Sequence, residues 1–178
     1  MNPLWSNIFR KKPEEESLAY FLGTIPLFSD LKNRDLHFLE SIVHQRHYDA
    51  GEVIFTEGDP GTGLYLVRSG KVSIYNHDAY GKRCSLVQLV QGDFFGETTL
   101  AAPANRAASA RTTEQCELIG LFRADMEEIS KKYPMIANKI LVGLARLLSE
   151  RLHLAAQQLN KAQAQGPPDQ DGEVRKDA

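Results

Sequence analysis

The spacing of apolar residues changes twice along this chain, from a helical period to short β-rich runs and back again. In the N-terminal part, apolar positions recur with the period of a helix. This pattern predicts one helix that begins near Pro13 and is broken by Gly23 and Pro26, and a second over residues 29–45.

The middle of the chain, from His47 to Phe122, has the pattern of a β-sheet protein. Runs rich in β-branched and aromatic residues alternate with turn signals such as EGDPGTG, HDAYGK and QGD. This spacing is typical of an all-β sandwich, roll or barrel. Strands are expected at residues 53–56, 63–70, 71–77, 84–90 and 116–122, with Phe94 and Phe95 ending a further strand.

Helical spacing returns after residue 122. It predicts a short helix over residues 123–133, ended by Pro134, and a long helix over residues 134–160. The apolar stripe of the long helix is wide enough to meet both its own β-core and a partner helix, so we expect a homodimer through this helix. The stripe contains Ile136, Ile140, Leu141, Leu144, Leu147, Leu148, Leu152, Ala155 and Leu159.

The predicted fold class is therefore α+β: an antiparallel β-roll flanked by N-terminal helices and a long C-terminal helix. Three segments follow from the pattern. Residues 1–16 form an amphipathic segment, residues 17–160 the domain with its C-terminal helix, and residues 161–178 a polar tail that is expected to be disordered.

Composition narrows the class of protein. The chain has 178 residues, 42% of them apolar, and a formal net charge of −2, which suits one soluble domain and argues against DNA binding by this chain alone. Its cysteines, Cys84 and Cys116, lie far apart and outside any CxxC pattern, so neither a disulfide framework nor a zinc site is expected. Neither a signal peptide nor a membrane span is evident, and the expected location is cytoplasmic.

The N-terminal segment of residues 1–16 places apolar side chains on one helical face beside a basic cluster, Arg10 to Lys12. Such a segment could lie on an anionic membrane. It could equally pack on the domain or dock a partner, which we favour, and disorder is the remaining alternative. The apolar residues are Leu4, Trp5, Ile8 and Phe9.

Candidate chemistry is concentrated in the stretch GDFFGETTLAAPANRAASA, where Glu97 and Arg106 lie nine residues apart among small residues. Gly96 permits a backbone turn that other residues resist, and a short helix after it would present N–H groups near Thr98 and Thr99 to an anion. The fork of Arg106 suits phosphate oxygens, whereas the Glu97 carboxylate suits a neutral hydroxyl such as that of a ribose. The stretch thus fits a nucleotide monophosphate. The alternative is an ordinary turn with a surface Glu97–Arg106 ion pair.

The same stretch resembles the phosphate-binding cassette of the cyclic-nucleotide-binding domain family, including the catabolite activator and the regulatory subunits of cyclic-AMP-dependent kinase. FGE matches its start and NRAAS its end, and GEVIFTEGDPGTGLYLVRSGKV is similar to the family's first strands and glycine turns. The resemblance covers about residues 18–159. It implies a double-stranded jelly roll that binds a cyclic nucleotide.

The resemblance also implies roles for individual residues. Glu97 would bind the ribose 2′-hydroxyl and Arg106 the cyclic phosphate. The remaining ligand-binding positions would be Gly96, the backbone at Thr98 and Thr99, Ala107 and Ala108.

Departures from the family pattern bear on affinity and on the choice of ligand. Thr98 stands where the family usually has Leu or Ile, and Thr99 where it often has Ala. Ala107 follows the arginine where members that prefer cyclic GMP often have Thr, so cyclic AMP is favoured and cyclic GMP is the alternative. Arg151 lies where a residue of the last helix can stack on the purine. Its alternative role is a solvated helix charge.

The predicted function is a stand-alone cyclic-nucleotide sensor, in which ligand binding moves the C-terminal helix and signals to a protein partner. One alternative is a degenerate domain of the same fold that acts as a scaffold without ligand. The other is an enzyme, since His44 and His47 are spaced to support a metal, with His37 nearby. No HExxH motif, paired carboxylates or activated nucleophile accompanies them, so neither a metal nor a catalytic residue is expected.

Overall fold

The computed structural model of this chain describes residues 17–164. The amphipathic segment predicted for residues 1–16, with the expected helix start at Pro13, lies outside the described residues, as do residues 165–178 of the predicted tail. The chain divides into two compact units, with the boundary between Leu144 and Ala145. This boundary falls inside helix α4 (Pro134–Ala164), which includes residues 161–164 that the sequence assigned to the tail.

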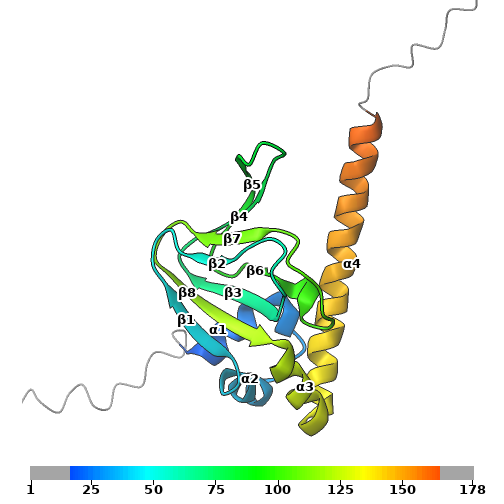
Figure 1. The fold of residues 1–178 in the computed structure, drawn as a ribbon. Helices are drawn as coiled ribbons and strands as arrows, with labels where there is room; N and C mark the ends of the chain where they lie inside the picture. Colours follow the sequence, from blue (N-terminus) through cyan, green and yellow to red (C-terminus); the bar gives the residue numbers. More distant parts are fainter. Residues whose placement is uncertain (1–16, 165–178) are drawn as a thin grey trace, which may run out of the picture. The chain divides into compact units, whose positions relative to one another are not determined.

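The first unit is built around two four-stranded antiparallel sheets, which confirms the predicted roll (Figure 1). One sheet has the order β1-β8-β3-β6 and the other β2-β7-β4-β5. The strands are β1 (His44–Tyr48), β2 (Val53–Phe55), β3 (Gly63–Ser69), β4 (Val72–His77), β5 (Arg83–Leu89), β6 (Phe94–Phe95), β7 (Ser109–Thr112) and β8 (Cys116–Phe122).

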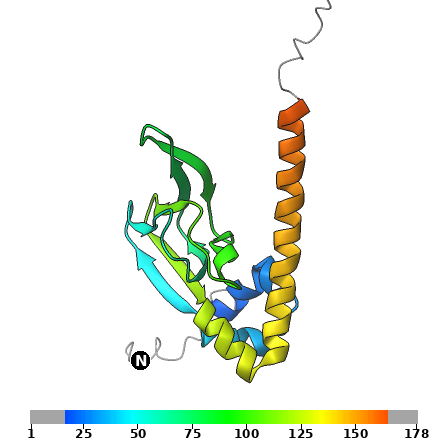
Figure 2. The ribbon, with the colours of Figure 1, turned by 45° about the vertical axis from the view of Figure 1, so that its right-hand side comes forward.

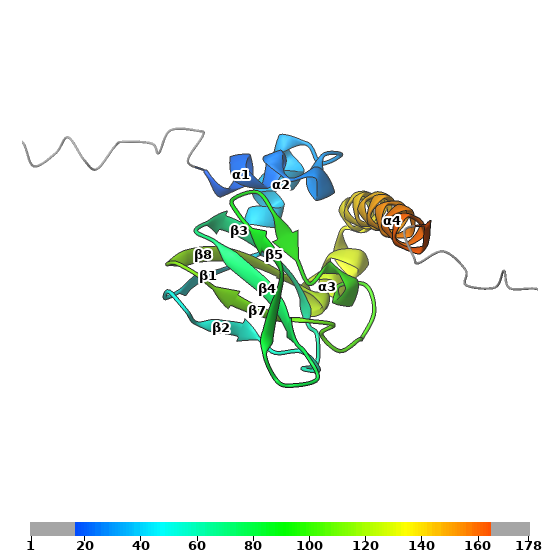
Figure 3. The same cartoon turned by 90° about the horizontal axis from the view of Figure 1, so that it is seen from above.

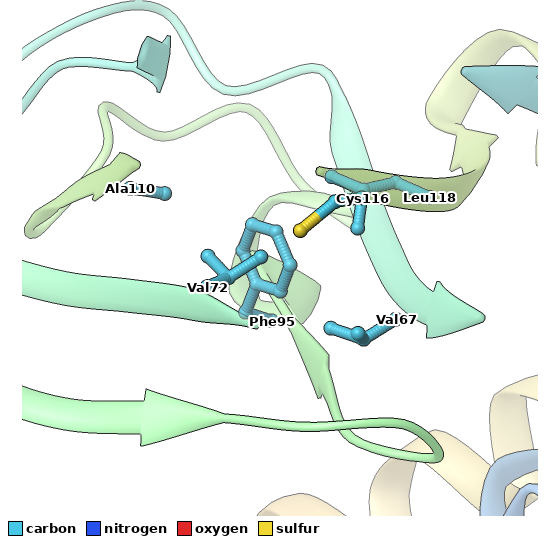
Figure 4. Packing of buried hydrophobic residues seen from close by; sticks show 6 residues of the cluster. All are labelled: Val67, Val72, Phe95, Ala110, Cys116 and Leu118. Carbon is cyan, nitrogen blue, oxygen red and sulfur yellow. The ribbon is translucent and has the colours of Figure 1, made fainter. Parts of the chain in front are cut away.

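The core of the roll lies between the sheets, where side chains from both converge (Figure 4). Its members come from five strands, and none is more than 5% exposed, so each is almost fully removed from water. They are Val67, Val72, Phe95, Ala110, Cys116 and Leu118. Partly buried aromatic residues, including Phe55 and Tyr65, pack against this cluster.

The N-terminal helices are α1 (Leu18–Thr24), η3 (Pro26–Phe28) and α2 (Asn33–Glu40), and α1 and α2 lie together beside the roll (Figure 3). The Ser17 hydroxyl caps α1 by accepting the N–H of Tyr20 at 3.0 Å. Helix α2 ends at Glu40, so the prediction of a helix to residue 45 was wrong. From His44 onward the backbone pairs with β8 instead, because that strand offers the same polar groups a ladder of hydrogen bonds.

Two helices follow the roll, as predicted: α3 (Arg123–Lys132) and α4. Within the first unit, α4 buries Ala137, Ile140 and Leu144. It is also joined to α2 by an ion pair of 2.6 Å between Lys139 Nζ and Asp35 Oδ2.

The β4–β5 hairpin extends beyond the neighbouring strands of its sheet (Figures 1 and 2). Its second strand is exposed along nearly its whole length. In residues 17–164, none of the helices has an apolar stretch long enough to cross a membrane.

Candidate functional site

Gly96 forms the turn at the start of the candidate site. It follows β6 and caps a single 3-10 turn, η4 (Glu97–Thr99), which confirms the predicted short helix. Its φ of 78° lies in the left-handed region, which favours glycine. A Cβ at this position would also lie 2.4 Å from Nη1 of Arg106, so both the backbone conformation and the available space require a glycine.

Arg106 is buried and enters the site beneath this turn. Its side chain is only 5% exposed. Nη1 donates to the Gly63 carbonyl at 2.9 Å, the Gly96 carbonyl at 3.2 Å and the Thr99 hydroxyl at 3.1 Å. The guanidinium carbon lies 4.1 Å from the ring centroid of Phe55, a cation–π contact. Nε is buried and has no hydrogen-bond partner.

Burial and the neighbouring groups have opposite effects on the charged form of Arg106. Burial lowers the pKa of its guanidinium, while Tyr65, Glu97 and Asp59 act in the opposite direction. Glu97 is itself buried, at 7% exposure, so the alternative of a surface Glu97–Arg106 ion pair is wrong. A buried guanidinium with an unpartnered N–H is costly unless something binds it.

Backbone contacts hold the Arg106 segment against the EGDPG turn. The Arg106 N–H donates to the Asp59 carbonyl at 2.8 Å, and its carbonyl accepts from Gly58 at 2.9 Å. An isolated β-bridge pairs Pro60 with Asn105. The position of Arg106 is therefore fixed by a turn that lies more than 40 residues earlier in the chain. The sequence had predicted this turn but not its contact with Arg106.

The other predicted site residues differ in how far they are exposed to solvent. Thr98 is exposed, whereas Thr99 is buried, with its hydroxyl at Arg106. The Thr99 amide was expected to be free, but it donates to the Gly96 carbonyl at 3.3 Å, because a 3-10 turn uses this N–H internally. Ala107 is exposed and Ala108 half-buried, and both lie between Arg106 and β7. Arg151 is exposed on α4, in the second unit.

Three contact residues of this site were missed in the sequence. Gly63 supplies a carbonyl acceptor and Phe55 the ring over which Arg106 lies. From the start of α3, Arg123 Nη1 donates to the Thr99 carbonyl at 2.9 Å and to the Gly61 carbonyl at 3.2 Å. The GTG sequence was a signal for close backbone approach, but nothing in the spacing of Arg123 pointed to the site.

The histidines that suggested a metal do not form a metal site. His44 and His47 both lie on β1, and an odd separation places strand residues on opposite faces. His44 Nε2 instead lies 3.2 Å from Asp125 Oδ1 at the start of α3. Within residues 17–164, no three His, Cys, Asp or Glu side chains gather where they could hold a metal ion.

Comparisons with known proteins give matches in sequence and in fold. A family model described as the cyclic nucleotide-binding domain matches residues 45–133, half of the chain. The cyclic AMP receptor protein of Thermus thermophilus is 38% identical over 125 residues, which cover 70% of this chain and 58% of that protein.

Solved structures share the fold. The crystal structure of the Thermus thermophilus catabolite activator protein has a TM-score of 0.70 and 36% identity, and the match covers 78% of this chain and 63% of that chain. The regulatory domain of Toxoplasma gondii PKA, crystallised with cAMP, has a TM-score of 0.59 and 30% identity, with coverage of 67% and 46%. This chain thus spans less than two thirds of each of these three relatives.

Proposed function

Because this chain belongs to the cyclic nucleotide-binding domain family, we propose that it is a sensor module that binds a cyclic nucleotide at Arg106, with cyclic AMP as the preferred ligand. One observation carries the proposal: a buried guanidinium whose Nε lacks a partner, set beneath a glycine turn among small residues. A cyclic phosphate would supply the missing acceptor and would pair its own negative charge with the guanidinium.

The roles of the site residues follow from their chemistry. Arg106 would bind the cyclic phosphate through its charge and its free Nε–H. The Glu97 carboxylate would accept a hydrogen bond from the ribose 2′-hydroxyl, which carries no charge to repel it. Gly96 and the backbone at Thr98 would complete the cradle, and Thr99 would join it once its amide leaves the Gly96 carbonyl.

The preference for cyclic AMP rests on the residue after the arginine and on the relatives. Ala107 lacks a hydroxyl that could bind guanine, and Ala107 and Ala108 leave space beside Arg106. One relative is named a cyclic AMP receptor protein, and another was crystallised with cAMP. Arg151 would stack on the purine from the last helix.

The output of the module would pass through α4 to a protein partner. The helix would have two positions, and the ligand would favour the one to which it binds more tightly. The size of this shift is limited by the difference in ligand affinity between the two states. Leu152 and Leu159 belong to the apolar stripe, lie on one face of α4 and are exposed, which suits a homodimer contact. No catalytic step or DNA contact is assigned to this chain. Cys84 and Cys116 are both free thiols, which fits a reducing cytoplasm.

Titration calorimetry with cyclic AMP and cyclic GMP tests the proposal. Arg106→Ala is expected to weaken binding about 10²–10³-fold, because it removes a buried charge partner of the phosphate. Glu97→Gln keeps a hydrogen-bond acceptor and is expected to cost less, about 3- to 10-fold. Arg46→Ala is the matched control, since Arg46 is exposed on β1.

The outcomes separate the candidate functions. No heat with either nucleotide, from a folded and nucleotide-free sample, would favour the scaffold without ligand. Binding that survives Arg106→Ala in a folded protein would show that the site lies elsewhere. Circular dichroism of each variant establishes that it is folded.

A further inference from the structure

We propose that Thr99 is a positioning residue for the ligand: its side-chain hydroxyl fixes one end of the Arg106 guanidinium and so orients the rest of the fork toward the phosphate. This inference rests on the proposed function, because it assigns a role at the same site. The Thr99 side chain would act through Arg106 and need not touch the nucleotide itself.

The hydroxyl of Thr99 lies within a small buried network. It accepts from Arg106 Nη1 at 3.1 Å, and it lies 3.0 Å from the Gly96 carbonyl and 3.3 Å from the Gly63 carbonyl, to which it can donate. A hydroxyl has one proton and two acceptor sites, so it can accept from the guanidinium while donating to one carbonyl. Thr99 is 1% exposed and Arg106 5% exposed, so water does not compete for these contacts.

Thr99 is itself held from two sides, so its hydroxyl has a fixed direction. Arg123 Nη1 donates to its carbonyl at 2.9 Å. Gly61 lies directly against its side chain, since a Cβ there would come within 2.3 Å of the Thr99 methyl carbon. A β-branched side chain has few χ1 states, and this contact restricts them further.

The network leaves the guanidinium with an asymmetry. Nη1 is surrounded by three protein acceptors, whereas Nε has none. The guanidinium is planar, so fixing Nη1 also fixes the direction of the Nε–H. A phosphate that binds at the Nε side would meet a donor already in place, and it would not have to order the side chain on binding.

A valine at position 99 keeps the shape and removes the hydroxyl, whereas a serine keeps the hydroxyl. We expect Thr99→Val to weaken cyclic AMP binding about 10-fold, and Thr99→Ser to stay within about 3-fold of wild type, as suits the loss or retention of one hydrogen bond to a charged group. Thr113→Val is the matched control, because its hydroxyl bonds to the Lys71 carbonyl, away from the site.

A second readout separates positioning from simple support of the fold. Calorimetry of the full chain is run with cyclic AMP and with its two phosphorothioate diastereomers, which differ only in which exocyclic oxygen is replaced by sulfur. If Thr99 orients Arg106, the ratio of the two diastereomer affinities moves toward one in Thr99→Val and is retained in Thr99→Ser. A loss of support for the turn would weaken both diastereomers equally.

The results that overturn the inference are distinct from those that overturn the function. Wild-type affinity and an unchanged diastereomer ratio in folded Thr99→Val refute the positioning role and leave the sensor intact. So does an equal loss in the valine and serine variants. A folded wild type that binds neither these three ligands nor cyclic GMP refutes the sensor, and the role of Thr99 with it.

Discussion

Helix α4 lies close to the backbone of η3 at Gly143, and this contact gives a sharp test of the packing. A Cβ at this position would lie 2.2 Å from the carbonyl oxygen of Leu27 and 3.1 Å from its carbonyl carbon. An ordinary carbon–oxygen contact is about 3.3 Å, so Gly143→Ala requires a shift of about 1 Å. Leu27 cannot easily move, because it is 1% exposed and lies in η3 between Pro26 and the equally buried Phe28.

Two effects of this substitution oppose each other. Alanine gains about 1 kcal/mol over glycine in a helix interior. Overpacking against fixed backbone costs about 1–3 kcal/mol. The clash is with backbone and not with a flexible side chain, so we place the cost at the upper end of that range. The net loss in the free energy of unfolding is then about 1–2 kcal/mol, or about 2–8 °C in Tm.

Urea unfolding and thermal melts followed by circular dichroism measure this loss. Asn138→Ala is the matched control, since Asn138 is exposed on the same helix and alanine there gains propensity without a clash. If Gly143→Ala is stabilised as much as Asn138→Ala, then α4 does not lie against η3 at this position, and the packing argument is wrong.

Three further predictions concern charge and association. The hydrogen bond from Lys139 lowers the pKa of Asp35 below 3.8, so the stability that the pair adds is present above this pH and is lost as the pH falls through the lowered pKa. Urea unfolding should show Asp35→Asn to be less stable by about 0.5–1 kcal/mol at neutral pH, with a difference that disappears in acid; a constant difference would contradict this. Burial raises the pKa of Tyr48 from 10.0 to about 12. The wild type should therefore lose stability more steeply than Tyr48→Phe as the pH rises above 10. Parallel curves of stability against pH for the two proteins would exclude ionisation of Tyr48 as the cause. Charged substitutions at Leu148 and Leu152 should dissociate a homodimer in sedimentation experiments, whereas a monomeric wild type would rule out that interface.

The sequence predicted the roll and its flanking helices, but it missed strands β1 and β7. The β1 sequence HQRHY is polar because four of its five side chains are exposed, so no apolar alternation marks it. In β7, Ser109 and Ala110 are fully buried between β2 and β4, yet their small side chains carry little β signal. Both strands exist because their neighbours offer backbone pairing, which is a tertiary effect.

At the candidate site, local sequence identified the turn at Gly96 and the pair Glu97 and Arg106. It could not identify what holds Arg106, because the acceptors are backbone carbonyls, which any residue type possesses. The Gly63 carbonyl lies 43 residues away in sequence from the arginine that it binds. The sequence also did not distinguish the two threonines of the turn, of which Thr98 is exposed and Thr99 is buried.

The two cysteines of the chain are unequal in a way that is useful for watching the roll open. Cys84 is exposed on β5, whereas Cys116 lies in the core, where burial raises the pKa of its thiol and its Sγ donates toward the Lys71 carbonyl. A thiol reagent should therefore modify Cys84 in the native protein and reach Cys116 only when the sheets separate. The labelling rate of Cys116 then reports how often the roll opens. Any ligand that binds only the closed form will lower this rate in proportion to its occupancy.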